Sequence, residues 1–468
     1  GRSFPDGFQW ATSSESFKVE GGWSEHGKGE TLWDRFGHEH QAFQNQTADL
    51  ACDSYHKVDY DVYLLRGLLV NTYQFSISWA RIFPSGHWGS HSEKGALYYD
   101  SLINALIEAG IEPAVTLHHW DLPQALQDYG GWTNDSIAEA FKDYADFCFF
   151  RFGDRVRTWN TFSSPWVISH AGYGTGQHPP GIKNYVVTHN MLKSHAEAWH
   201  VYNDKYRKDQ GGKVGIALDS NWAEPPSSSS KPEDVVAADR YLQFMLGWFA
   251  HPIFVDGDYP PLLKSQIEQK RRDCSLSVPA ILPFFTAAES KRIRGTADFL
   301  GLNHYTSRLV NASDGGCVPG PEGVGDFKAH VDHSWPSTAS DWIHSAPWGL
   351  RRLLNYVSAE YLNVTKVPVY ITGNGIPTGS VLRLFERMIV YKDSIHLDGV
   401  DVQRFTVQSL MDGFEGPKGY SQRFGLHYVN FEDPNRPRTP KQSAYFYSDI
   451  IKRNGFLSSK RKSSLMSP

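Results

Sequence analysis

Several groups of polar and aromatic residues each follow a short apolar run of the sequence. They are His118–Asp121, Asn303–Tyr305, Gly373–Asn374 and Asp412–Glu415. Amide, imidazole and carboxylate groups beside aromatic faces are suited to binding a neutral ligand rich in hydroxyl groups. The chain has no Gly-rich phosphate-binding motif. The pattern therefore favours a sugar-like ligand over a phosphate or a nucleotide.

These groups follow eight apolar or β-branched runs that alternate with longer helical patterns. The predicted strands are Phe8–Thr12, Thr72–Ser78, Ala114–His118, Thr158–Phe162, Val214–Leu218, Phe299–Asn303, Val367–Thr372 and Val402–Val407. The helical patterns include Tyr98–Ala109, Asp135–Phe152, His189–Lys208, Ala237–Phe249 and Pro347–Tyr361. This alternation predicts an α/β protein with a single (β/α)₈ TIM barrel. Because sites in that fold lie where strands end, the polar groups should meet on one rim.

Length and composition allow one large domain or two to three ordinary ones, and the alternation of strands and helices favours a single barrel. The chain has 468 residues, of which 40% are hydrophobic. We predict a barrel over residues 1–457 and a polar basic tail over 458–468. The net charge of −5 provides no broad basic surface, so no nucleic-acid partner is expected. No apolar run approaches about 18 residues, so no direct membrane insertion is expected, and no cofactor or metal is implied.

The cysteines and glycosylation motifs bear on location. Cys52 and Cys148 lie among apolar residues and are predicted to be buried thiols, whereas Cys274 and Cys317 could pair or stay free. Asn-x-Ser/Thr motifs occur at Asn45, Asn134, Asn311 and Asn363. Together these motifs predict a secreted or lumenal glycoprotein. The N-terminus, which lacks methionine, is typical of a processed chain or of a segment of a longer one. The chain could be one segment of a larger, membrane-anchored ectodomain.

The strand-end motifs resemble those of glycoside hydrolase family 1, the retaining β-glycosidases. The likeness runs from Phe4 to Tyr447 and rests on five motifs. They are Glu20–Trp23, Phe75–Trp79, Leu117–Gln124, Asn303–Thr306 and Ser409–Glu415. Within the family the chain looks most like a repeated domain of the lactase-phlorizin hydrolase group with a degenerate active site. The klotho and lactase-like proteins are neighbours. The resemblance implies a role in carbohydrate metabolism and a β-glycoside or glycan ligand.

The resemblance also implies where two catalytic carboxylates should lie. Family members use one glutamate as the acid and base and another as the nucleophile, about 5 Å apart. The acid/base pattern Thr-x-Asn-Glu-Pro aligns with Thr161–Pro165, which places Ser164 at the glutamate. The nucleophile pattern Ile-Thr-Glu-Asn-Gly aligns with Ile371–Gly375, which places Gly373 there. Neither position can supply a carboxylate, so we predict no catalytic residues.

Other positions of the family pocket are partly retained. The predicted substrate-binding residues are His119, Trp120, Asn303, Tyr305 and Glu415. In the family the first and last of these bind sugar hydroxyls and the tyrosine orients the nucleophile. Four family side chains are replaced, an arginine by Gln74, a glutamine by Lys18, and two tryptophans by Gln408 and Gly416.

Three hypotheses follow. The first is a catalytically inactive pseudo-glycosidase domain of a lactase-type protein, with a residual glycan pocket or a role in folding or partner binding, including sister domains. The second is a klotho-like module that binds a protein partner. The third is an active retaining β-glycosidase that uses substitute groups such as Glu415, Glu20 or Asp121. Because acid–base catalysis contributes roughly 10²–10⁴-fold and nucleophilic catalysis is separate, the third is disfavoured.

Overall fold

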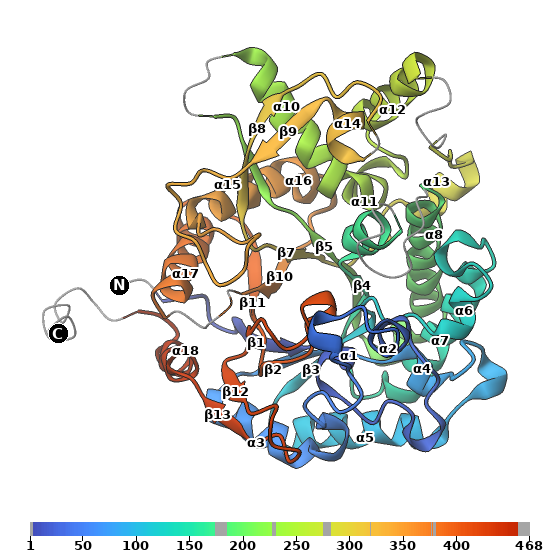
Figure 1. Cartoon of the computed structure of the whole chain (residues 1–468), viewed down its shortest axis with the longest axis vertical. Helices are drawn as coiled ribbons and strands as arrows, with labels where there is room; N and C mark the ends of the chain where they lie inside the picture. The colour runs from blue at the N-terminus through green and yellow to red at the C-terminus, as the bar shows by residue number, and fades with distance from the viewer. Residues whose placement is uncertain are drawn as a thin grey trace, which may run out of the picture.

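A closed barrel of eight parallel strands forms the centre of the molecule (Figure 1). The computed structural model describes residues 3–173, 185–226, 231–274, 282–318, 320–375, 377 and 381–456. The strands are β1 Gln9–Ser14, β2 Thr72–Ser76, β3 Glu112–His118, β4 Thr158–Ser163, β5 Lys213–Asp219, β7 Leu300–Asn303, β10 Val369–Asn374 and β11 Val402–Gln408. Each neighbours the next in chain order, and β1 closes on β11. The predicted (β/α)₈ barrel and its eight strands are confirmed, while the predicted tail at 458–468 lies outside the described residues.

Helices surround the strands on the outside (Figure 1). The longer ones are α3 Val58–Leu68, α5 Glu93–Glu108, α7 Ile137–Phe152, α8 Val186–Val201, α10 Pro232–Leu242, α12 Pro261–Cys274, α15 Pro347–Val357, α17 Val381–His396 and α18 Gln442–Arg453. The shorter ones are α1 Ser16–Val19, α2 Leu32–His38, α4 Trp79–Ile82, α6 Gln124–Gln127, α9 Arg207–Gln210, α11 Trp248–His251, α13 Ala287–Ile293, α14 Pro321–Gly325 and α16 Asn363–Thr365.

The hydrophobic pattern explains why these helices lie against the strands. In α15 the buried residues Leu350, Leu353, Leu354 and Val357 recur every three or four positions, which gives one apolar face. The barrel strands are buried on both faces, and in β10 every residue is buried. Many aromatic residues fill this core, including the fully buried side chains of Trp79, Trp132, Trp159 and Trp248.

Two small sheets extend the barrel. The strands β6 Trp222–Glu224, β8 Ser307–Ala312 and β9 Phe327–His330 form one, near α10 and α14 (Figure 1). The strands β12 His427–Val429 and β13 Arg438–Pro440 form an antiparallel pair. A disulfide between Cys274 and Cys317 joins the end of α12 to the segment after β8. Cys52 and Cys148 are buried free thiols, as predicted.

One strand boundary differs from the prediction in a way that affects the site. The predicted strand Val367–Thr372 begins and ends two residues later, at Val369 and Asn374. Gly373 pairs with Asn303 of β7 through a shift in register that follows Ile371. Gly373 and Asn374 therefore belong to the barrel wall, and their positions are set by hydrogen bonds to neighbouring strands.

Candidate functional site

Three neighbouring strands bring Asp219, Asn303 and Gly373 to one level of the barrel rim. The parallel register pairs Asp219 of β5 with Asn303 of β7, and Asn303 with Gly373 of β10. The Asn303 amide is held from both sides, because Nδ2 donates to Ser163 Oγ at 3.1 Å and Oδ1 accepts from Thr372 Oγ1 at 2.7 Å. Asn303 is therefore a fixed polar centre between the other two positions.

Gly373 is enclosed at the point where a side chain would begin. A Cβ added there would lie 2.8 Å from both Asn303 Oδ1 and the Tyr305 hydroxyl, so a neighbour would have to move. The Tyr305 hydroxyl donates to Gln408 Oε1, and Arg387 donates to the Tyr305 carbonyl oxygen at 2.6 Å. Burial raises the pKa of Tyr305 well above its ordinary value, so the hydroxyl keeps its proton. Polar neighbours thus occupy the space beside residue 373.

Gln74 of β2 contacts β10 beside Gly373, although the two strands are not neighbours in the barrel. Its Nε2 donates to the Thr372 carbonyl oxygen at 2.9 Å. Its Oε1 has no hydrogen-bond partner in the part of the chain that the structure describes. A neutral amide suits this buried position, because an unpaired guanidinium would be costly there.

Ser164 contacts a carboxylate that sequence reasoning missed. Its hydroxyl donates to Asp219 Oδ1 at 2.8 Å and accepts from Asn303 Nδ2 at 3.2 Å. Asp219 is 6% exposed, and its burial raises its pKa to about 6 despite the Ser164 hydrogen bond. A carboxyl group therefore lies beside Ser164, although it comes from β5 and not from β4.

Lys18 forms a buried cluster with two carboxylates. Its Nζ lies 3.0 Å from Glu415 Oε2 and 3.6 Å from Glu15 Oε2. Burial opposes the charge of Lys18, but the two carboxylates outweigh it and raise the lysine pKa. Burial also raises the pKa of Glu415, and Lys18 limits that rise. The predicted sugar-binding carboxylate Glu415 is thus paired within the chain.

His119 and Trp120 lie beside an aromatic cluster. Trp33 contacts Trp120 edge-on at 5.2 Å between ring centroids and stacks on Phe17 at 5.4 Å. The His119 ring lies 6.3 Å from Phe17, and burial lowers its pKa to about 4, so it is neutral near pH 7. Gly416 has a φ of +57°, and a Cβ there would lie 2.7 Å from Trp33. The indole of Trp33 therefore fills the space beside Gly416.

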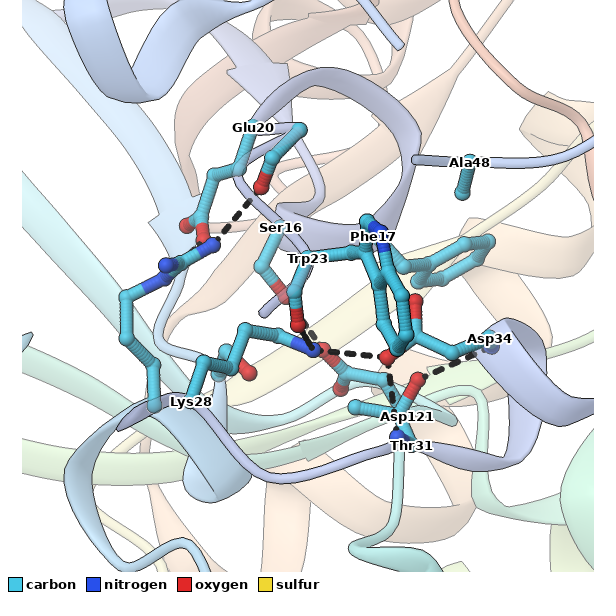
Figure 2. Close-up of a pocket in the computed structure, with 12 residues that line it drawn as sticks. Ser16, Phe17, Glu20, Trp23, Lys28, Thr31, Asp34, Ala48 and Asp121 are labelled. Carbon is cyan, nitrogen blue, oxygen red and sulfur yellow. Dashed lines mark hydrogen bonds and ion pairs between the residues drawn. The ribbon is translucent and has the colours of Figure 1, made fainter. Parts of the chain in front are cut away.

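The other carboxylates considered as substitutes, Glu20 and Asp121, line a small cavity of about 10 Å³ (Figure 2). Glu20 accepts from Arg81 Nε at 3.0 Å and from the Tyr99 hydroxyl at 2.7 Å. Asp121 accepts from the Ser16 hydroxyl, and burial raises its pKa to about 7. The cavity has room for about one water molecule. Both oxygens of Glu20 are hydrogen-bonded, whereas Asp121 Oδ1 has no hydrogen-bond partner among the described residues, and the cavity that both residues line has no room for a sugar.

The structure thus brings Asn303, Tyr305, Ser164 and Gly373 together, with Glu415 and His119 in neighbouring clusters. Sequence reasoning missed Asp219, although a polar residue directly after the run Val214–Leu218 was a usable signal. The sequence identified Gln408 only as the residue that replaces a family tryptophan and predicted no contact for it. Among the described residues, no group of His, Cys, Asp and Glu could hold a metal ion. No described helix is long and apolar enough to cross a bilayer.

Comparisons with known proteins agree on one family. The family model for glycosyl hydrolase family 1 matches residues 1–456. The chain is 54% identical to human lactase/phlorizin hydrolase over 472 residues, which covers 97% of this chain and 24% of that protein. It is 44% identical to human lactase-like protein, with coverage of 97% and 82%. The solved structure of aphid myrosinase matches with a TM-score of 0.91 and 38% identity, over 97% of this chain and 100% of that one.

Proposed function

The chain belongs to glycosyl hydrolase family 1, and from that premise we propose that it is a non-hydrolytic β-glycosidase-like domain. The family mechanism requires one carboxylate on each side of the scissile bond. By resemblance these positions are Ser164 and Gly373. A serine hydroxyl is a very poor acid near neutral pH, and glycine has no side chain. The catalytically inactive form is therefore preferred over an active retaining β-glycosidase.

The observation that carries this proposal is the enclosure of Gly373. The Tyr305 hydroxyl and Asn303 Oδ1 lie where a side chain at position 373 would begin. Tyr305 donates to Gln408 and not to a nucleophile. The carboxylates weighed as substitutes are engaged too, since Glu415 pairs with Lys18. The polar side chains around Gly373 thus bond to one another, and none of them supplies the missing nucleophile.

We place the domain in a lactase-type protein, where it has a residual glycan-binding or a folding and partner-binding role. The chain spans about a quarter of the length of the human and rat lactase/phlorizin hydrolases that it matches. Sister domains in a larger protein are therefore the partners that we propose first. A secreted or lumenal location, or a membrane-anchored ectodomain, is supported by the Cys274–Cys317 disulfide and by exposed glycosylation motifs at Asn45 and Asn363.

Hydrolysis and binding are tested separately. The purified chain is incubated with 4-nitrophenyl β-glucoside beside a mock preparation and the variant Glu415→Gln. We expect no turnover above the mock. Turnover that Glu415→Gln abolishes would overturn the proposal in favour of an active glycosidase with substitute groups. Calorimetric titration with a non-hydrolysable β-glucoside then decides whether a glycan pocket remains.

A klotho-like role in binding a protein partner is the second candidate. It is supported by the 39% identity to mouse klotho over 97% of this chain. Failure to bind any simple glycoside, together with binding to sister domains produced separately, would favour the partner-binding role. Binding of a glycoside with no such association would favour the residual glycan pocket.

A further inference from the structure

The carboxyl group of Asp219 lies at the same rim as the two family positions. Asp219 and residue 373 flank Asn303 on its two neighbouring strands, so their Cα atoms are two strand spacings apart, about 10 Å. The Asp219 carboxylate also touches the hydroxyl of Ser164, at 2.8 Å. A carboxyl group on β5 therefore contacts the residue at which the family pattern places a glutamate.

The surroundings of Asp219 suit a group that exchanges a proton. Its Oδ1 accepts from Ser164, and its Oδ2 has no hydrogen bond of ordinary geometry among the residues that the structure describes, although the Asn303 amide and the Val167 backbone N–H lie close enough to limit the rise of its pKa. The side chain is more than nine-tenths buried, and burial raises its pKa to about 6. A pKa near the working pH is what a general acid and base requires. Asp121 and Glu20 differ, because both lie in the separate cavity of Figure 2.

We propose that Asp219 is a proton-transfer residue at this rim of the barrel and takes the place of the carboxyl group that Ser164 cannot supply. The barrel then lacks one reacting group, the nucleophile, and not two. The ligand class is a β-glycoside whose glycosidic oxygen accepts the proton of Asp219. This inference goes beyond the proposed function, because the natural chain remains non-hydrolytic without a nucleophile at position 373.

A carboxylate introduced at position 373 would complete the reaction. Its oxygen would bond to the anomeric carbon while the glycosidic C–O bond breaks and Asp219 protonates the departing oxygen. Water would then attack the anomeric carbon and give its proton to Asp219, and the bond to the introduced carboxylate would break. Protons and electron pairs balance, and no further reactant is needed.

The test compares Gly373→Glu with Gly373→Glu/Asp219→Asn. Each is assayed with phenyl β-glucoside, whose leaving group needs a proton, and with 2,4-dinitrophenyl β-glucoside, whose leaving group does not. Loss of Asp219 should lower kcat/KM about 10²–10⁴-fold for the phenyl substrate. For the dinitrophenyl substrate the loss should stay below about fivefold. A merely structural role of Asp219 would lower both substrates equally, which would overturn the proposal.

Controls address the crowding at position 373. Gly373→Ala adds the Cβ without a carboxylate and should hydrolyse neither substrate. Adding Gln408→Ala to both test proteins removes the acceptor that holds Tyr305 beside residue 373. Folded proteins that hydrolyse neither substrate in either background would overturn the proposal.

If the glutamate variants do not fold, the proposal is tested on the natural chain by NMR. The protein is labelled with ¹³C at the aspartate carboxyl carbon, and the Asp219 signal is assigned by its absence in Asp219→Asn. A titration near pH 6 that shifts when a non-hydrolysable β-glucoside is added supports the proposal, whereas a titration that the glucoside leaves unchanged would overturn it, because a carboxyl that is merely buried would behave in that way. Titration at or below about pH 4.5 would overturn it, because the group would then hold no proton near neutral pH. Wild-type turnover is tested separately, so failure of this inference leaves the proposed function standing.

Discussion

Replacing Asp219 by asparagine is expected to make the stability of the protein less sensitive to pH between about 4 and 6. The folded chain raises the pKa of this carboxyl from 3.8 to about 6. Since one pKa unit corresponds to roughly 1.4 kcal/mol, the shift corresponds to about 3 kcal/mol. The side chain is 6% exposed, so solvent screening removes little of this energy.

The direction in which the free energy of unfolding changes with pH follows from the number of protons that each state binds. Between pH 3.8 and about 6 the folded state holds the Asp219 proton while the unfolded state has released it. The free energy of unfolding therefore falls as pH rises through this range, and the full cost is present above about pH 6. Asparagine has no proton to lose and can still accept the hydrogen bond from Ser164. The variant should thus gain up to about 3 kcal/mol relative to the natural chain between pH 4 and pH 7.

Urea unfolding followed by tryptophan fluorescence measures this difference at several pH values. Other carboxylates titrate in both proteins, so the difference between the two curves isolates position 219. Asp6→Asn, at an exposed position near the N-terminus, controls for the loss of one aspartate charge. A difference between natural chain and Asp219→Asn that stays constant from pH 4 to pH 7 would refute the reasoning, because the buried carboxyl would then have an ordinary pKa.

Three further changes can be measured by the same unfolding method. Lys18→Met should cost about 3–5 kcal/mol at pH 7, because it leaves buried Glu415 unpaired. Adding Glu415→Gln should recover part of that loss, and a simple sum of the two single costs would contradict this. Replacing Cys274 and Cys317 by serine should cost about 4 kcal/mol for a sequence separation of 43 residues, whereas unchanged melting under reducing conditions would show no contribution. Gly373→Ala should cost about 1–3 kcal/mol through overpacking, and a neutral effect would show that its neighbours yield easily.

The fold was predictable from the sequence because its signals are local. Each barrel strand is a short apolar run, and the amphipathic pattern of segments such as Pro347–Val357 sets the helices between them. The strand containing Gly373 was displaced by two residues, because its end depends on pairing with Asn303. Strand ends depend on contacts with neighbours that are distant in the sequence.

The candidate site was predictable in its residues but not in its connections. Asn303 and Tyr305 could be selected from their motif, yet the bond from Tyr305 to Gln408 joins residues 103 positions apart. Lys18 could be recognised as a replaced glutamine, but its pairing with Glu415 needs the closed barrel. These contacts depend on how distant strands are positioned, which no local pattern in the chain specifies.

Through its hydrogen bond to Tyr305, Gln408 influences which side chains position 373 can accommodate. A larger residue at position 373 meets both the Tyr305 hydroxyl and Asn303 Oδ1, and replacing Gln408 would release only the first of these contacts. The effects of changes at 373 and 408 should therefore be non-additive, as for residues in direct contact. A carboxylate at position 373 should therefore be accommodated better when Gln408 has also been replaced.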